Sequence, residues 1–447
     1  MPTAIRIIAQ KIDTETEVIL DSTICKEDTI KKPGTLEGLG YMHVEQIDLL
    51  KSLQDFKIKH QCVLINQSDV CPNCEGNAIS QGTRKSPFHA VLTDHEVLIR
   101  RRRCSCGWSS PYSLEGIYGS SIHPDLLEKQ VVQGTENSYR SASKNLNGES
   151  HSVRPINNIE RIRNNVAKVG NLIAFDKLKK VDEVKKKDAA SNLIAVVDGG
   201  HIKSNEDEAR SFEAMIATVY NPKNIRSIDK NHNEIYKKTS VASALSDKQE
   251  TIKQLIVNAC RTEGSHSNLT TLTCLTDGAN NCWSITNTLE PYVKTFISIL
   301  DWFHITKRFT VINNCIHCHL KERLDKVKWH LWHGKSETAL NRINTLINDI
   351  DDEKTREKLT ELYSYINRNK QYLVNYQLRQ SEGLPFTSTL AESSVNSLIN
   401  RRQKNNKKMQ WSRYGSHHLL QIETSIFSKT WDRDWDSAKH KIYKLEA

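Results

Sequence analysis

The stretch from Leu272 to His304 constrains the fold most strongly, because it has the pattern strand, helix, strand with an aspartate after each strand. The apolar run before Asp277 is short and rich in β-branched residues, a glycine follows it, and the run before Asp301 repeats the pattern. We therefore predict that both carboxylates lie at strand ends. Acidic side chains at the carboxyl edge of a buried sheet are where α/β folds place metal-binding and catalytic groups.

The segments before this stretch predict a larger α/β sheet. An apolar run ends at Asp198 before two glycines, a second run follows, and a third, weaker one lies near residues 236–245. A helix comes next, with Asp247 as the expected cap and Gly264 as its end. Three strands, a helix, a fourth strand ending in Asp277, a helix and a fifth strand is the order of the ribonuclease H-like fold. That fold brings together the acids that end its first and fourth strands.

The chain after His304 is helical in pattern for about eighty residues, too long for a loop, and we predict an all-helical insertion. Within it, the run from Cys315 to His319 also suits a metal, although such residues on a continuous helix are more often packed. A capped helix then carries Glu392 in its first turn. Thr389 and Glu392 also match a capping box, which is the purely structural interpretation of that glutamate.

The composition indicates a polyanionic partner. The 447 residues hold 63 Lys+Arg against 53 Asp+Glu, a formal net charge of +10, and the pI is near 8.9. The mean hydropathy is −0.57, and no apolar run of about eighteen residues predicts a membrane span. The N-terminus lacks a signal-peptide layout, so we expect an intracellular protein. Eleven cysteines, several of them close together, favour thiols or metal ligation over disulfides in a reducing compartment.

Two close cysteine pairs flank a predicted β-hairpin in the N-terminal region. Cys71 and Cys74 precede it, and Cys104 and Cys106 follow it. Four thiolates on two turns match a zinc ribbon with a structural Zn²⁺, although unrelated buried thiols would give the same count and the second pair has a shorter spacing. The run Arg100 to Arg103 beside them either contacts phosphates of a nucleic acid or forms a solvent-exposed strand edge.

Between residues 123 and 170 the apolar residues recur at helical spacing, with a glycine break and then a stripe from Val153 to Val169. Ser152 stands where a helix cap is expected, and Pro155 in the first turn. A short helix, a turn and a longer basic helix resemble a helix-turn-helix that reads the major groove, although three packed helices without a DNA role have the same period. Residues 176–190 are charge-rich, and we expect a solvated linker or surface helix. Basic side chains predicted to contact DNA lie in this helix-turn-helix and in the segment after Glu392. They are Arg154, Arg161, Arg163, Arg401, Arg402, Lys404, Lys407 and Lys408.

Three carboxylates in this order predict metal-dependent phosphodiester chemistry. Such cleavage needs two or three acids converging on a pair of cations, one of which activates the nucleophile while the other stabilises the leaving oxygen. Asp198 and Asp277 on neighbouring strand ends, with Glu392 on a later helix, supply such a set. Hard oxygen ligands favour Mg²⁺, with Mn²⁺ as the alternative.

The motifs of residues 190–430 resemble those of DDE-class transposases of bacterial insertion sequences, specifically the ISKra-type family. They are VVDGGHI around Asp198, RSFEAMIATVY, LTDGANNCW around Asp277, ILDWFHITKR around Asp301, KWHLWHG, LAESSVNSLINRR around Glu392, and MQWSRYGSHHLL. The resemblance implies an enzyme that binds terminal inverted repeats of double-stranded DNA, cuts at the element ends and joins the 3′-hydroxyls to target DNA. It also implies a homodimer or larger assembly on DNA, in the bacterial cytoplasm and on the nucleoid when bound.

The same resemblance implies roles for individual residues. Asp198, Asp277 and Glu392 correspond to the metal-binding triad. Asp301 and His304 resemble the C/D-x-x-H motif of Mutator-like transposases, in which the histidine works close to the active site and Asp301 would support it; the alternative is a packing pair at a strand end. Two positions depart from the family pattern: His201 stands where arginine is common, and Glu423 where a basic residue is expected.

The predicted domains and the competing functions follow from these motifs. A ribonuclease H-like nuclease without strand transfer, and an inactive or domesticated sequence-specific DNA-binding regulator, are the alternatives to a transposase. We divide the chain into residues 1–119 with the zinc ribbon, 120–190 with the helix-turn-helix and linker, 191–305 as the first part of the catalytic core, 306–386 as the helical insertion, and 387–447 with the catalytic helix and basic tail.

Overall fold

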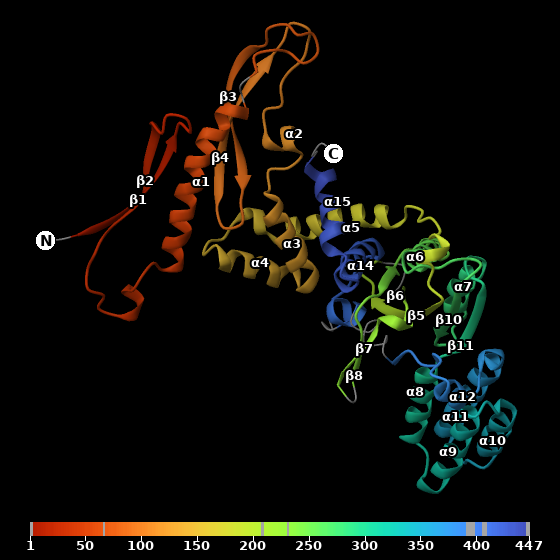
Figure 1. Ribbon diagram of the computed structural model, residues 1–447. Coiled ribbons are helices and arrows are strands. Elements are labelled where there is room, and N and C mark those ends of the chain that lie inside the picture. The colour runs from red at the N-terminus through yellow and green to blue at the C-terminus, as the bar shows by residue number, and fades with distance from the viewer. Residues whose placement is uncertain are drawn as a thin grey trace. The chain divides into compact units, whose positions relative to one another are not determined.

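The computed structural model of the chain (Figure 1) describes residues 3–65, 68–206, 210–229, 232–389, 398–404 and 409–443. The chain divides into two compact units, residues 1–166 with 435–447, and residues 167–434. No helix in the described ranges combines the length and the apolar character that crossing a lipid bilayer requires.

The N-terminal unit contains two separate β-hairpins and several helices. Its helices include one long helix after the first hairpin and a group of three before residue 166. The elements are β1 (Ala4–Ile12), β2 (Ile19–Thr29), α1 (His43–Ile65), β3 (Ile79–His89), β4 (Asp94–Arg103), α2 (Leu114–Tyr118), α3 (Pro124–Glu136), α4 (Tyr139–Glu149) and the first part of α5 (Ile159–Lys177).

The hairpin predicted between the cysteine pairs is confirmed as β3 and β4, which pair antiparallel. Apolar and polar residues alternate along β4, so that Val97 and Ile99 face inward and pack on Leu114 of α2. The alternation breaks after Ile99, where Arg100 and Arg101 are both exposed; Arg102 is 4% exposed and forms an ion pair with Asp69. The four consecutive arginines therefore do not form one exposed row.

The helices predicted between residues 123 and 170 are present, but the start of the long one differs from the prediction. Residues Pro155–Asn157 form a 3-10 turn, and α5 begins only at Ile159. The side chain of Asn158 accepts from the backbone N–H of Arg161 (2.8 Å), so Asn158 acts as the cap in place of Ser152. Val153 is accordingly 89% exposed and lies off the apolar stripe.

The C-terminal unit is built on a five-stranded mixed sheet with strand order β11-β10-β5-β6-β9. The predicted order of three strands, helix, strand, helix, strand is confirmed for the strands of this sheet, and an unpredicted two-stranded hairpin lies between the second and third of them in the chain. The elements are β5 (Asn192–Lys203), β6 (Ser211–Tyr220), β7 (Ile225–Asp229), β8 (His232–Ile235), β9 (Thr239–Ser243), α6 (Glu250–Thr262), β10 (Thr271–Thr276), α7 (Asn280–Thr286) and β11 (Thr295–Leu300).

Alternate residues of the central strand β5 enter two different cores. Ile194 and Val196 belong to the core shared with α8 to α11, whereas Ala195 and Val197 belong to the core shared with α6 and α7. Strand β5 is parallel to β10 and antiparallel to β6. Both faces of the sheet are thus covered, which explains why these strands are continuous apolar runs.

The helices predicted after His304 are present as a set of helices after β11. The first of them begins at Trp302, earlier than the predicted start at residue 306, because Asp301 caps it. The helices from here to the end of the described chain are α8 (Trp302–Asn313), α9 (Cys318–Trp332), α10 (Ser336–Asn348), α11 (Glu353–Arg368), α12 (Tyr376–Ser381), α14 (Arg413–Phe427) and α15 (Trp431–Tyr443).

The predicted linker, residues 176–190, begins inside α5 and is not wholly solvated. Lys177 donates from Nζ to the carbonyl oxygen of Gln421 (2.8 Å) and to Oγ1 of Thr424 (2.7 Å), both on α14. Burial lowers the pKa of Lys177 to about 7. A charge-rich pattern alone did not distinguish this anchoring lysine from its solvated neighbours.

Candidate functional site

Three aspartates lie at the same level of three adjacent parallel strands of the sheet. The last paired residues of β5, β10 and β11 form one row, Val197, Thr276 and Leu300. The next residue in each case is an aspartate: Asp277 and Asp301 follow the last residues of β10 and β11, whereas Asp198 lies within β5, which continues to Lys203 along β6. The predicted strand end is therefore confirmed for Asp277 and Asp301 and wrong for Asp198, although all three acids lie at one acidic edge, at the level of the sheet where β10 and β11 end.

Asp198 and Asp277 are half-buried and held by backbone donors. The N–H of Gly199 donates to Asp198 (2.8 Å), and the N–H of Ala279 donates to Asp277 (2.9 Å). Burial raises the pKa of Asp198 above its ordinary value, His304 lowers it in part, and Asp277 raises it further. Asp198, Asp277 and His304 thus influence one another electrostatically.

The turn after Asp277 requires glycine and is supported by the helical insertion. Gly278 has a φ of +89°, and a Cβ there would lie 2.7 Å from the Leu300 side chain and 2.8 Å from Nδ2 of Asn369. The hydroxyl of Tyr365, on α11, donates to the carbonyl oxygen of Asp277 (2.9 Å). Sequence reasoning missed Tyr365 and Asn369, because residues about ninety positions downstream give no local signal.

Asp301 differs from the other two aspartates because its carboxylate is already engaged. It is 1% exposed and accepts from the N–H of Phe303 (3.1 Å), which makes it the cap of α8. It also accepts from the backbone N–H of Ser388 (2.9 Å) and from the Ser388 hydroxyl. Nε2 of His304 lies 3.7 Å from the same carboxylate.

Glu392, the third predicted metal ligand, lies outside the described residues, but described residues on both sides of it reach this edge. On one side is Ser388, bound to Asp301. On the other side Ile399 and Lys404 pack on Gly200, where an added Cβ would lie 2.4 Å from Ile399 and 3.5 Å from Nζ of Lys404.

A fourth carboxylate near this edge, Glu213 of β6, was not predicted. Its Oε2 accepts from Nδ2 of Asn281 at the start of α7 (2.6 Å). Its Oε1 is so close to Gly199 that a Cβ on that glycine would approach it to 2.4 Å. Glu213 therefore ties β6 to the helix after Asp277 and its carboxylate lies close to Gly199, the residue after Asp198. The only sequence signal was a charged residue inside an otherwise apolar strand.

A polar groove of about 780 Å³ extends over α8 and α11. Tyr365 lines it, and the guanidinium of Arg308 lies 3.9 Å from the centre of the Tyr365 ring. Since Tyr365 also bonds the backbone of Asp277, the groove adjoins the acidic edge. Its lining residues are Arg308, Glu353, Arg356, Glu357, Thr360, Glu361, Ser364, Tyr365 and Arg368.

In the N-terminal unit the four predicted cysteines come together and could bind a metal such as zinc. All four sulfurs lie within 4.8 Å of one another. The pair Cys71 and Cys106 is separated by 3.6 Å and the pair Cys74 and Cys104 by 3.5 Å. These separations fit thiolates around one tetrahedral ion, for which Zn–S bonds of about 2.3 Å imply sulfurs roughly 3.8 Å apart. Gly107, with a φ of +94°, closes the second cysteine turn.

The thiols of this cluster titrate unequally. A backbone hydrogen bond from Cys106 lowers the pKa of Cys104 to about 6, with Cys74 contributing. The backbone of Gly76 lowers the pKa of Cys74, but contacts with the other three thiols outweigh it and raise this pKa to about 12. Four sulfurs this close disfavour full ionisation unless a cation joins them.

The basic residues predicted to contact DNA differ in exposure. Arg154 is 4% exposed, and its guanidinium binds Asp94 and the carbonyl oxygens of Ala90, Val91 and Thr93. Arg402 is 3% exposed and lies over the Trp411 ring. These two guanidinium groups are held within the protein and are not displayed to a ligand. Arg161, Arg163, Arg401 and Lys404 are exposed, and Lys407 and Lys408 lie outside the described residues.

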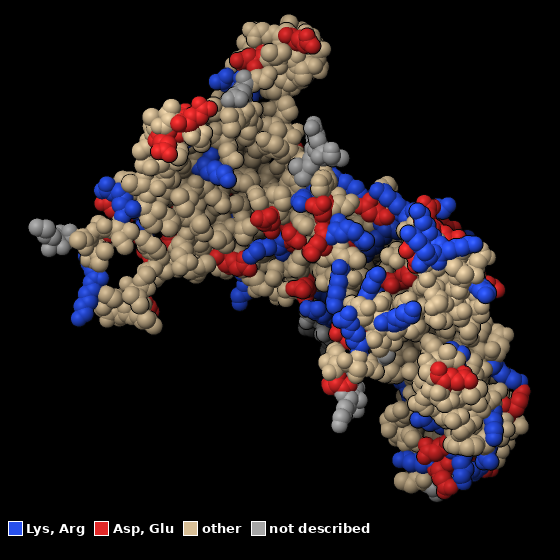
Figure 2. All heavy atoms as spheres, viewed as in Figure 1, with Lys and Arg blue, Asp and Glu red and all other residues tan. Residues whose placement is uncertain are grey.

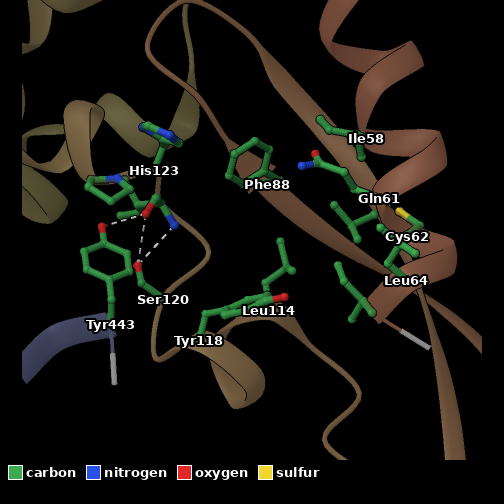
Figure 3. Close-up of a pocket in the computed structure, with 14 residues that line it drawn as sticks. Ile58, Gln61, Cys62, Leu64, Phe88, Leu114, Tyr118, Ser120, His123 and Tyr443 are labelled. Carbon is green, nitrogen blue, oxygen red and sulfur yellow. Dashed lines mark hydrogen bonds between the residues drawn. The ribbon is translucent and has the colours of Figure 1, made fainter. Parts of the chain in front are cut away.

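A separate cavity of about 440 Å³ in the N-terminal unit lies between α1, β3, β4 and the end of α15 (Figure 3). Ile58, Phe88 and Leu114 give it an apolar wall. On its polar side the hydroxyl of Tyr443 donates to the carbonyl oxygen of Ile122 (2.7 Å). Its lining contains no carboxylate, so it has no chemistry in common with the acidic edge.

A protein-family model matches residues 116–440, which is more than half of the chain. The chain belongs to the uncharacterised protein family UPF0236. The match to UPF0236 includes the acidic edge, the helical insertion and the segment that contains Glu392. It begins after the cysteine cluster.

Among solved structures, the chain is similar to the Drosophila P element transposase strand transfer complex, with 10% identity and a TM-score of 0.30. The similarity covers 68% of this chain and 92% of that one. It is too distant to transfer a residue or a mechanism. No curated protein matches the chain.

Proposed function

We propose that this protein is a DDE transposase that cleaves DNA at element ends and joins the 3′-hydroxyl strand to target DNA. The observation that carries the proposal is the row of aspartates in register, with Asp198 within the first strand beside Asp277 at the end of the fourth. The sheet order supports assigning a ribonuclease H-like core, interrupted by the helices from α8 to α12.

Asp198, Asp277 and Glu392 are the proposed ligands for Mg²⁺ or Mn²⁺. Two half-buried carboxylates on neighbouring strands form an oxygen donor set that suits a hard divalent cation. When bound there, such an ion lowers the pKa of an attacking water and neutralises charge on the phosphate. The contacts of Ser388 and Ile399 with this edge support Glu392, which lies between them in the chain, as the third ligand.

His304 is the proposed group that orients or protonates a phosphate or leaving oxygen. It lies in the first turn of α8, and its ring nitrogen is close to the buried carboxylate of Asp301. Asp301 is the proposed positioning residue for His304, because its own oxygens are taken by the α8 cap and by Ser388.

The DNA contacts are proposed for the exposed basic residues only. These are Arg161 and Arg163 on α5, in the proposed helix-turn-helix, and Arg401 and Lys404 beside β5. The cysteine cluster is proposed to hold a structural Zn²⁺ in a zinc ribbon, since four protein thiolates leave no open position for chemistry.

The test is an assay with labelled DNA that carries the inverted repeats flanking the reading frame, with Mg²⁺ and target DNA. We expect cut ends and joined products with the wild-type protein, both lost in Asp277→Asn. Asp325→Asn, an exposed aspartate on α9, is the matched control and keeps full activity. Cleavage without joining would favour the nuclease, and binding without any cutting would favour the DNA-binding regulator.

A further inference from the structure

Two cysteines between α8 and α9 take no part in the acidic edge. Cys315 lies in the turn after α8, and Cys318 is the first residue of α9. Among the described side chains, neither belongs to a group of three ligands that could hold a metal ion. The described part of this run therefore does not form the metal site that its sequence also suits.

The thiol of Cys315 is in direct contact with a cation from another helix. Nζ of Lys358, on α11, donates to its Sγ (2.8 Å), and Sγ donates to the carbonyl oxygen of Val311 (3.2 Å). Cys315 and Lys358 are both partly exposed, so a small reagent in solution has access to the sulfur. An ammonium group against a sulfur stabilises the thiolate, which is the form of cysteine that attacks other sulfur atoms. Cys315 thus has the surroundings of a nucleophilic cysteine.

Cys318 has the position of a second cysteine that can react with the first. It is exposed and begins a helix of 15 residues, whose N-terminus also favours a negatively charged sulfur. Only Ile316 and His317 separate it from Cys315, and neither of them lies in a helix or a strand. A disulfide needs its two Cα atoms at about 4.4–6.8 Å, and a change in this short turn alone is enough to set that separation.

The other cysteines of the C-terminal unit are withdrawn from solvent. Cys260, Cys274 and Cys282 are all buried. Burial raises the pKa of the Cys260 thiol to about 12 and holds that of Cys274 well above its ordinary value, so both remain protonated. The accessible thiols of this unit are therefore those of Cys315 and Cys318.

We propose that Cys315 and Cys318 are a site of reversible thiol–disulfide exchange with a low-molecular-weight disulfide such as glutathione disulfide. The Cys315 thiolate attacks one sulfur of the reagent, a mixed disulfide forms, and one glutathione thiolate leaves with the electron pair of the broken bond. The Cys318 thiolate then attacks the Cys315 sulfur and displaces the second glutathione thiolate. The chain loses two electrons and two protons, which leave on two molecules of glutathione. The site does not rest on the proposed transposase function, because exchange requires neither DNA nor Mg²⁺.

The test is a time course of the reduced, full-length protein with glutathione disulfide, stopped by acid and followed by alkylation and peptide mass spectrometry. We expect a disulfide between Cys315 and Cys318 that dithiothreitol reverses. It should form about 10-fold or more faster than the mixed disulfide of Cys25, a partly exposed cysteine on β2 that serves as the internal reference. In Cys318→Ser, the glutathione adduct of Cys315 should accumulate instead.

The contribution of the lysine is tested separately. Lys358→Gln should slow the first attack by Cys315 about 10-fold, whereas Lys358→Arg, which keeps the positive charge, should retain most of the rate. Lys354→Gln, at an exposed lysine one turn earlier on α11, is the matched control and should react like wild type.

Three results would overturn the proposal: a Cys315 that reacts no faster than Cys25, an unchanged rate in Lys358→Gln, or two separate adducts with no bond between Cys315 and Cys318. The comparison of Cys315 with Cys25 uses wild-type protein only, so it holds even if a variant fails to fold.

Discussion

Asp198 and Asp301 have the same side chain and lie at the same level of one sheet, yet their surroundings separate their roles. Asp198 is half-buried and is influenced by Asp277 and His304. Asp301 is fully buried, caps α8 and binds both the backbone and the hydroxyl of Ser388. An aspartate whose oxygens are occupied in this way holds other groups in place and does not itself ligate an ion.

The link between Asp301 and Ser388 is therefore expected to position Glu392. In Ser388→Ala we expect the rate of DNA cleavage to fall about 10- to 100-fold and the Mg²⁺ concentration for half-maximal cleavage to rise, as for other residues that support metal ligands. DNA affinity is expected to stay the same, and Ser388→Thr is expected to restore the rate in part. Ser381→Ala, whose hydroxyl bonds only within α12, is the control. Unchanged Mg²⁺ dependence would show that Ser388 has no positioning role.

Asp94 and Arg154 give the N-terminal unit a pH-dependent contact. Burial raises the pKa of Asp94, but hydrogen bonds and charges of His89 and Arg154 outweigh it and hold this pKa well below its ordinary value of 3.8. A lowered folded-state pKa stabilises the fold above pH 3.8, and this contribution is lost as the pH falls toward the folded-state value.

Asp94→Asn should thus lower the free energy of unfolding at pH 7, because it removes the charge that pairs with Arg154. The loss is expected to be only about 1 to 2 kcal/mol, because the carboxylate is partly exposed and solvent screens the ion pair. Urea unfolding at several pH values would measure this difference, which should shrink below pH 3.8. Glu96→Gln, in an exposed pair on the same strand, is expected to change stability by much less. A difference independent of pH would rule out the ionic explanation.

At the scale of elements, each site depends on turns that bring distant strands or helices together. The two cysteine turns close the open end of the β3–β4 hairpin, and α11 supports the Asp277 turn through Tyr365. Neither β3 nor β4 packs on a large apolar core. A metal that cross-links the two cysteine turns would therefore contribute much of the stability of this hairpin.

For the cysteine cluster we expect one zinc ion per chain in metal analysis of the purified protein. Cys74→Ser should lose that ion and, with it, the slow hydrogen exchange of β3 and β4, because three thiolates no longer complete a tetrahedral shell. Cys25→Ser, on the other hairpin, should keep both. Full zinc content in the Cys74 variant would exclude Cys74 as a ligand.

At the scale of the whole molecule, the excess of basic residues predicts binding to a polyanion. Figure 2 shows Lys and Arg side chains spread over the visible face of the C-terminal unit. Since phosphate contacts release counterions, the logarithm of DNA affinity should fall linearly with the logarithm of salt concentration.

The double variant Arg161→Gln, Arg163→Gln is expected to make that slope shallower by about two, one for each phosphate contact removed. Fluorescence anisotropy over a salt series would measure it. Lys326→Gln, which removes an exposed lysine of α9 already paired with Glu322, is the control. If the double variant and the control have the same slope as wild type, α5 does not face the phosphates.

The sequence by itself predicted the chain order of most strands and helices between residues 191 and 305, because apolar runs and glycine turns are local patterns, whereas the order of the strands within the sheet was decided by the tertiary structure. It also determined which cysteines converge, since each pair lies within one turn. Only the tertiary structure decided the roles of residues whose partners are distant in the chain. Arg154 and Arg402 look like DNA contacts in sequence but are buried, and the carboxylate of Asp301, which was predicted to support His304, also binds Ser388. The sequence showed Glu213 only as a charged residue in an otherwise apolar strand, because its significance comes from Asn281 and Gly199 on other elements. Burial and long-range hydrogen bonds, which no spacing encodes, made these distinctions.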